Sequence, residues 1–177
     1  MHDWLQQRAL FEELALPHSN SLLRAALRLT GSRSAAEDLV QDTLLSAWRA
    51  FKRFQPGTDC KAWLFRIMLN GSNRARTELR RSQSLVPIED SEPVAPRNSD
   101  PLENESIERA LASLPQEQRI ALLLAAVEGF SCQEIADITG APIGTVMSRL
   151  SRGRSALKSQ WLPASLTNGP RKKAHGL

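Results

Sequence analysis

The chain has 177 residues, a formal net charge of +4 and only 5% aromatic residues, with no tyrosine. This length suits one domain or two small ones, and a hydrophobic content of 41% is enough for a packed core. The first ten residues include charged side chains and are not expected to be a signal peptide, and no apolar run approaches the ~18–20 residues of a membrane span. Cys60 and Cys132 match no metal-ligand spacing, so we expect a reducing cytosol and no metal or cofactor.

Charge is distributed along the chain in blocks. Residues 52–81 contain 8 basic and 2 acidic side chains, and residues 142–173 contain 7 basic and no acidic ones. Between these blocks, residues 82–108 contain 7 acidic side chains and one basic side chain. Two basic blocks, each ending a helical segment, indicate two separate contacts with a polyanion such as nucleic acid. Solvated helix faces are the alternative interpretation of each block.

The first half of the chain predicts four helices and, because strand-forming runs are scarce, an all-α protein. Serines are the expected caps of the second and third helices, the third through a capping box at Ser34 and Glu37. The expected spans are Trp4 to Leu14, Ser19 to a stop at Gly31, Ser34 to about Phe51, and Cys60 to Arg81.

The third of these helices has two distinct faces. Its apolar stripe consists of Ala36, Val40, Leu44, Ala47, Trp48 and Phe51. Its polar face has roughly helical spacing and consists of Asp38, Gln41, Asp42 and Arg49. One side therefore packs on a core, and the other is free for solvent or a partner.

The sequence predicts two small helical domains, residues 1–81 and residues 105–162, joined by a flexible linker over residues 82–104. The linker is acidic and contains four prolines between Ser82 and Pro101, so it cannot bury enough apolar surface to order itself. A basic tail, residues 163–177, is expected to be disordered.

The second domain ends in a predicted helix-turn-helix. A helix is expected over 107–114, and the next runs from Pro115 to a stop at Gly129. A capping box at Ser131 and Glu134 then opens a short helix, and a glycine turn leads to a last helix with Pro142 in its first turn, ending near residue 161. Two helices around a tight glycine turn, the second basic, are typical of this DNA-binding motif.

The last helix contains side chains suited to reading bases. An apolar set is expected to hold the helix pair together: Ile135, Ala136, Ile138, Val146, Leu150 and Leu157. That packing leaves Met147, Ser148, Ser151 and Arg152 pointing outward. An arginine in the major groove can pair bidentately with guanine, while a hydroxyl and an apolar side chain suit adenine or thymine.

Two ordered sets of motifs run along the chain. The first half contains Ala36-Glu37-Asp38-Leu39-Val40-Gln41-Asp42-Thr43, Ala47-Trp48, Phe54-Gln55-Pro56-Gly57, Ala62-Trp63-Leu64-Phe65-Arg66-Ile67 and Asn70. The second half contains Leu114-Pro115-Gln116-Glu117-Gln118-Arg119, Glu128-Gly129-Phe130-Ser131, Glu134-Ile135-Ala136 and Gly144-Thr145-Val146-Met147-Ser148-Arg149. In this order, with a linker between them, the motifs resemble those of the extracytoplasmic-function sigma factors, from residue 11 to residue 162.

The resemblance implies a promoter-recognition subunit of bacterial RNA polymerase without catalytic residues. Its implied partners are the clamp helices of the polymerase largest subunit, the polymerase flap, promoter DNA and an anti-sigma factor. Asp38, Gln41 and Asp42 would bind the clamp helices. The upstream promoter element near −10 would be bound by Lys61, Arg66, Asn70, Arg74, Arg76, Arg80 and Arg81. The −35 element would be bound by Thr145, Met147, Ser148, Arg149, Ser151, Arg152 and Arg154.

Two other classes of protein stay open at this point. A free-standing helix-turn-helix regulator with a helical sensor domain would explain the second half but not the motifs of the first. An enzyme would need its acidic pairs, such as Glu12-Glu13, to lie beside a histidine or a metal ligand, which the sequence does not supply. Whether DNA binding requires polymerase core separates the first alternative from the sigma factor.

Overall fold

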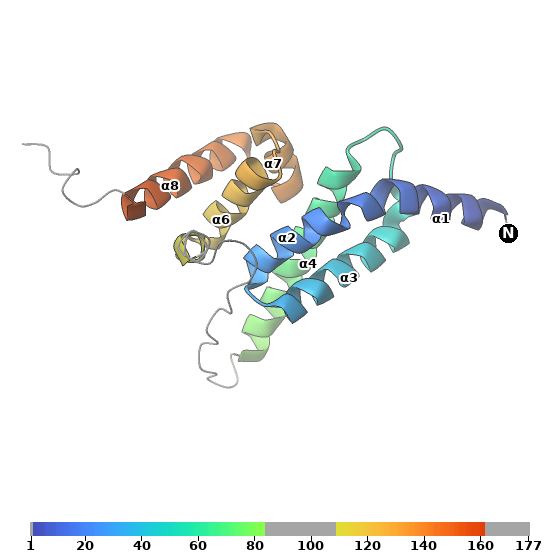
Figure 1. The fold of residues 1–177 in the computed structure, drawn as a ribbon, viewed down its shortest axis with the longest axis horizontal. Helices are drawn as coiled ribbons and strands as arrows, with labels where there is room; N and C mark the ends of the chain where they lie inside the picture. Colours follow the sequence, from blue (N-terminus) through green and yellow to red (C-terminus); the bar gives the residue numbers. More distant parts are fainter. Residues whose placement is uncertain (1, 84–108, 162–177) are drawn as a thin grey trace, which may run out of the picture.

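A computed structural model describes residues 2–83, here called the first module, and residues 109–161, the second module. The described residues are helical and contain no strand, so the predicted all-α fold of two small helical domains is confirmed for them. Figure 1 shows the two modules side by side. Ser82 and Gln83, predicted to begin the linker, are helical instead, and the rest of the predicted linker and the predicted basic tail lie outside the described residues.

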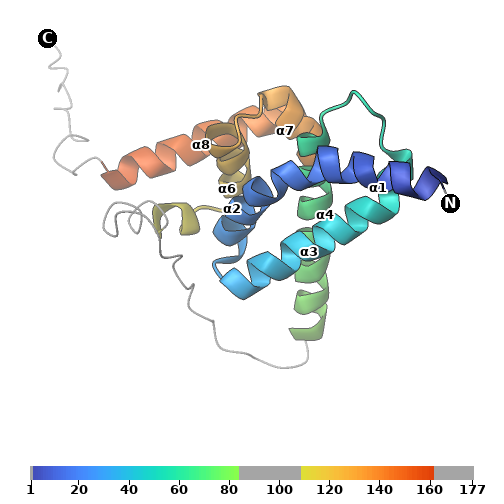
Figure 2. The same cartoon turned by 45° about the vertical axis from the view of Figure 1, so that its right-hand side comes forward.

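The first module is built from four α-helices and two single 3₁₀ turns. α2 packs on α3, and α3 packs on α4, so that α4 lies across the pair (Figures 1 and 2). Amphipathic spacing along α3 buries Ala36, Val40, Thr43 and Ala47 on the side that faces these helices. The elements in chain order are α1 (His2–Ala15), η1 (Leu16–His18), α2 (Ser19–Thr30), α3 (Arg33–Ala50), η2 (Phe51–Arg53) and α4 (Cys60–Gln83).

The predicted capping box of α3 is wrong. Ser32, not Ser34, is the N-cap, and its hydroxyl accepts a hydrogen bond from the backbone N–H of Ala35 at 3.4 Å. The reason is the left-handed Gly31 (φ 67°), after which Ser32 is the last residue with extended backbone. Ser34 is already helical.

The predicted cap of α2 is also wrong. The backbone of the preceding residue is already helical, because η1 leads directly into α2. The Ser19 hydroxyl therefore donates backward to the carbonyl of Leu16 at 2.7 Å instead of accepting from a free N–H of the next turn.

The second module contains a helix-turn-helix preceded by a helix with a wide last turn. α6 (Gln116–Leu122) continues as a single π-helical turn, η3 (Leu123–Val127). α7 (Cys132–Thr139) and α8 (Ile143–Trp161) follow, and Gly140 between them adopts φ 68°. The predicted capping box of α7 is confirmed. Pro142 lies just before α8 rather than inside its first turn, and its carbonyl accepts the N–H of Thr145 at 2.8 Å.

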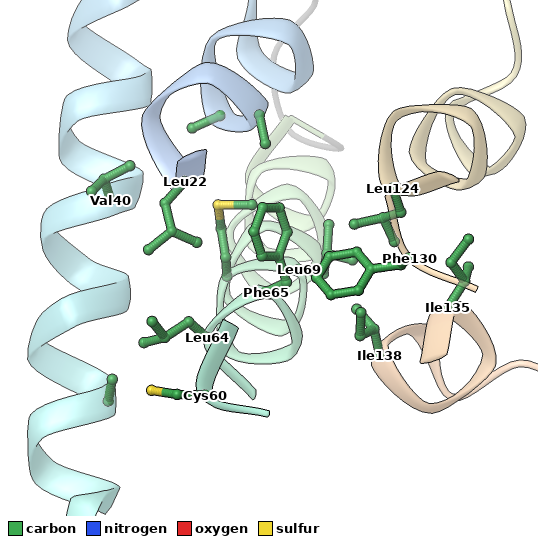
Figure 3. Close-up of a cluster of buried hydrophobic side chains, with 14 of the residues drawn as sticks. Leu22, Val40, Cys60, Leu64, Phe65, Leu69, Leu124, Phe130, Ile135 and Ile138 are labelled. Carbon is green, nitrogen blue, oxygen red and sulfur yellow. The ribbon is translucent and has the colours of Figure 1, made fainter. Parts of the chain in front are cut away.

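One hydrophobic core extends through both modules. Figure 3 shows Leu64 of α4 pointing toward α3, while Phe65 lies beside Phe130 of the second module. Phe65 and Leu64 are fully buried, and α4 also packs against α7. α4 is therefore the central helix, covered on one side by its own module and on another by the second.

Candidate nucleic-acid interface

The outward face of α8 begins at its first residue, Ile143, which is 45% exposed. Met147 is 58% exposed, and Ser151 and Arg154, four and seven residues further along, are exposed as well. On the opposite face Val146 and Leu150 are buried against α6 and α7. The spacing of 3.6 residues per turn thus separates a packing face from an open face; of the residues predicted to point outward, Met147, Ser151 and Arg152 are exposed and Ser148 is half-buried.

Two residues predicted to contact bases are hydrogen-bonded to each other in the structure. Arg152 donates from Nη2 to the hydroxyl of Ser148 at 3.0 Å and from Nε to the Ser148 carbonyl at 3.3 Å. The Ser148 hydroxyl in turn donates to the carbonyl of Thr145 at 2.9 Å. These bonds hold the exposed Arg152 guanidinium along the helix, toward the end that enters a groove in a helix-turn-helix.

Arg149 has a different environment from the other α8 arginines. Its side chain is 22% exposed and forms an ion pair with Glu117 of α6. Arg149, Glu117 and Thr145 line a cleft of about 320 Å³ between the modules, and Asn70 of α4 lines the same cleft. The cleft brings together residues predicted to read two different promoter elements.

The middle of α4 exposes three of the predicted −10 residues, namely Arg66, Asn70 and Arg74. Arg66 and Asn70 are four residues apart, as are Asn70 and Arg74, so the three share one face of the helix. The side chains of Arg76, Arg80 and Arg81 lie outside the described residues. An amide flanked by two guanidinium groups can accept and donate hydrogen bonds in a positively charged setting.

Lys61, at the start of α4, is turned away from this face. Its side chain is only 24% exposed, and its Nζ lies 2.9 Å from Oε2 of Glu128 in the second module. Lys61 is predicted from the sequence to neutralise phosphates. In this conformation it neutralises a carboxylate instead.

The polar face of α3 lies on the outside of the molecule. Asp38, Gln41 and Asp42 are all exposed, and Leu45, one turn beyond Gln41, is 46% exposed. A strip of carboxylates with one apolar side chain suits a basic protein partner. α3 therefore presents a second type of surface, opposite in charge to α8.

Sequence reasoning missed the packing of two charged residues, one half-buried and one buried. Arg119 donates from Nη2 to the carbonyls of Ala112 (2.6 Å) and Leu114 (3.2 Å), which ties the start of the second module to α6. Burial lowers the pKa of this guanidinium below its usual value. Glu128 is the other, with a side chain only 1% exposed. Both residues occur in the quoted motifs, but nothing in their local pattern indicates burial.

Burial also raises the pKa of the Cys60 thiol, with a smaller contribution from the neighbouring Asp59 carboxylate. Across residues 2–83 and 109–161, no three histidine, cysteine, aspartate or glutamate side chains gather where they could hold a metal ion. Over the same residues, no helix has the length and apolar character needed to cross a membrane.

Comparisons with known proteins match both modules. The family model for Sigma-70 region 2 matches residues 14–84, and that for Sigma-70, region 4 matches residues 104–157. The ECF RNA polymerase sigma factor EcfG of Rhodopseudomonas palustris is 40% identical over 144 residues, which cover 78% of each chain. SigM of Mycobacterium tuberculosis is 34% identical over 152 residues, covering 85% of this chain and 76% of the relative.

The fold has a similar counterpart among solved structures. The sigma factor RpoE from Bartonella quintana, solved in complex with the anti-sigma factor NepR, superposes with a TM-score of 0.71. The two chains are 36% identical, and the match covers 84% of this chain and 94% of the other. Sequence and fold thus resemble the same proteins.

Proposed function

The chain belongs to the extracytoplasmic-function (ECF) sigma factors, which direct RNA polymerase to promoters, and from this premise we propose which of its surfaces perform each step of initiation. The exposed face of α3 binds polymerase core, the Asn70 face of α4 holds the melted −10 strand, and the outward face of α8 reads the −35 duplex.

The outward face of α8 is the observation that carries this proposal. Within the described part of the helix every charged side chain is basic, and the exposed row starts at its N-terminal turns. A major groove about 12 Å wide admits such a helix, and N-terminal residues of a recognition helix contact base edges. Arg152 is the base-reading arginine, while Arg154 and Lys158, further along, neutralise phosphates.

On α4, Asn70 is the residue proposed to hold an unstacked base. Its amide can donate and accept, which matches the edge of a base that is no longer paired. Arg66 and Arg74, one turn away on either side, are proposed to neutralise the strand that carries this base. Arg76 and Lys61 are proposed to join them, Lys61 only after it leaves Glu128.

On α3, the carboxylates of Asp38 and Asp42 are proposed to dock on the clamp helices of the polymerase largest subunit, with Gln41 between them. Complementary charge steers such an encounter and fixes its register. The second module is proposed to reach the polymerase flap when it sits on the −35 element.

We propose further that the protein acts by binding alone, without a catalytic step, and that it works in the bacterial cytoplasm, where the polymerase is. The Bartonella quintana RpoE structure contains the anti-sigma factor NepR. An anti-sigma protein is accordingly proposed as a partner of this chain too.

The deciding experiment is to combine the protein with purified polymerase core and sequence the transcripts. We expect transcripts that start at a defined distance from common −35 and −10 elements. Asp38→Arg with Gln41→Ala should weaken core binding in a pull-down by at least ~tenfold, because like charges across an interface repel. Glu13→Arg, at an exposed position of α1, is the matched control and should bind core normally. Sequence-specific DNA binding without core would instead favour a free-standing regulator.

A further inference from the structure

Ile143 and Met147 form an exposed apolar strip at the start of α8. Ile143 is 45% exposed and Met147 is 58% exposed. The two residues are four positions apart, so they lie one turn from each other on the same side of the helix. The packing face of the helix, with Val146 and Leu150, is buried within the second module and leaves this strip open. The strip is therefore available to a partner.

The first two turns of α8, residues 143–149, contain a single charged side chain. It is Arg149, which is 22% exposed and forms an ion pair with Glu117 of α6. The side chains that these turns expose to solvent are thus apolar rather than charged. A contact made here with a base has to use an apolar group.

The nearest exposed arginine serves the other edge of the outward face. Arg152 is five residues beyond Met147, which places it about 140° further around the helix at 3.6 residues per turn. Its guanidinium is hydrogen-bonded to the hydroxyl of Ser148 at 3.0 Å, on that same edge. The apolar strip and Arg152 therefore face different positions of a bound duplex.

Gly144 leaves the backbone next to the strip bare. A Cβ atom built at this position would meet no atom within 4 Å outside its own stretch of helix, so packing within the protein does not require a glycine. Glycine disfavours a helix by up to ~1 kcal/mol relative to alanine. What it offers in return is close approach of another molecule to the helix backbone. Open space beside an apolar strip suits the flat edge of a base pair.

The charge of α8 identifies the kind of partner. Every charged side chain in its described part is basic, which fits the phosphates that border a major groove. Among the four bases, thymine alone presents an apolar group in that groove, its 5-methyl group, and apolar side chains contact it. Guanine is read there by arginine or lysine, and the strip contains neither.

From these observations we infer that Ile143 and Met147 are specificity-determining residues, which read the 5-methyl groups of thymines in the −35 duplex. This inference rests on the proposed function, because it names the base that the first two turns of α8 select. One helical turn advances about 6 Å, and stacked base pairs are ~3.4 Å apart, so the strip spans two or three neighbouring base pairs. Arg152 reads a separate base from the opposite edge.

The test removes the methyl group from the DNA and leaves the protein intact. A promoter that the parent protein transcribes with polymerase core is selected from a randomised −35 library. Each −35 thymine, on either strand, is then replaced in turn by deoxyuridine, which lacks only the 5-methyl group. Titration of the promoter with core and the full-length protein should show about fourfold weaker binding at one or two of these positions, or ~0.8 kcal/mol for one buried carbon. The remaining replacements should have no effect.

Substitutions then locate the contact on α8. Met147→Ala and Ile143→Ala should each bind the thymine promoter more weakly, and each should lose sensitivity to deoxyuridine at a position where the parent is sensitive. Met147→Leu keeps an apolar side chain and should stay sensitive. Val127→Ala is the matched control, because it shortens an apolar side chain of the second module that is 44% exposed but lies outside α8. It should respond to deoxyuridine as the parent does.

A parent that selects no thymine at −35, or binds thymine and deoxyuridine promoters equally, would overturn the inference. Full sensitivity in both alanine variants would do the same. Weaker binding of Met147→Ala to core in the absence of DNA would assign the strip to the polymerase instead of a base. A protein that selects −35 sequences but ignores the methyl group refutes only this inference, whereas one that selects no −35 sequence with core refutes the proposed function.

Discussion

α4 and α8 are both basic helices, yet the structure treats their charges differently. α8 buries one face, pairs Arg149 with Glu117 of its own module, and leaves Arg152 and Arg154 open to solvent. α4 is packed by two modules, and its first cation, Lys61, is held by Glu128. A block of basic residues therefore indicates that a helix is suited to DNA, but the packing around each side chain decides which cations are available. Each helix thus has exposed arginines and one paired cation, but the pair of α8 lies within its own module whereas that of α4 joins the two modules.

The largest expected effect on stability comes from a residue of α4 in the core between the two modules. Phe65 is fully buried and contacts Phe130 across the modules. Phe65→Ala should lower the free energy of unfolding by ~3–5 kcal/mol, because it leaves a cavity in a core that serves both modules. Urea denaturation measures this change. Leu45→Ala, at a position 46% exposed, is the control and should stay within ~0.5 kcal/mol. A similarly small loss of unfolding free energy for Phe65→Ala would mean that the core between the modules contributes little to stability.

A second prediction tests the proposed role of Asn70 on α4 in holding the melted −10 strand. Asn70→Ala should lower run-off transcription from duplex promoters by roughly tenfold or more, because extruding a base costs a few kcal/mol that the amide helps to offset. Templates already melted at −10 should recover part of the yield. Equal losses on both templates would indicate a structural role for Asn70, and equal yields would remove it from the site.

A third prediction concerns the N-terminal cap of α7. The Ser131 hydroxyl accepts the N–H of Glu134 at 3.2 Å, so Ser131→Ala should cost ~1 kcal/mol of stability in thermal or urea unfolding. Ser155→Ala, on the exposed side of α8, is the control and should change stability by less than ~0.5 kcal/mol. No difference between the two variants would argue against the cap.

The smallest expected effect is a dependence on pH. A hydrogen bond from the Ser131 backbone N–H, and then one with its side chain, lower the pKa of Glu134. A lowered pKa means that the contribution is full at neutral pH and is lost as pH falls through that pKa, below the ~4.3 of a free glutamate. Glu134→Gln should therefore reduce stability slightly at neutral pH and make no difference in acid. A difference that grows in acid would contradict the assignment.

Features contained within a few residues were predictable from the sequence. The capping box of Ser131 and Glu134 spans one helical turn, and the left-handed glycines at 31 and 140 follow from the helix stops they mark. The outward face of α8 follows from helical periodicity alone. Ser32 escaped prediction because Ser34, with Glu37 three residues later, fits the capping-box pattern, whereas Ser32 is followed at that spacing by Ala35; the backbone after Gly31 decides for Ser32.

The contact between the modules could not be predicted, because its partners are distant in sequence. Lys61 and Glu128 are separated by 67 positions, and each looks locally like an ordinary surface charge. The π-helical turn that aims Glu128 has an apolar sequence no different from that of an α-helix. Tertiary packing, not local propensity, places these residues.

The division of labour between α4 and α8 is the central claim, and transcription from a randomised promoter library tests it most directly. Core polymerase is supplied with the parent protein, Asn70→Ala, Arg152→Ala or Arg154→Ala, and the transcribed promoters are sequenced. We expect Arg152→Ala to relax preference at one −35 position by ~1–3 kcal/mol and Arg154→Ala to weaken all sequences about equally. Asn70→Ala should alter preference only at −10. If Arg152→Ala changed the −10 preference, or left the −35 preference intact, the account would be contradicted.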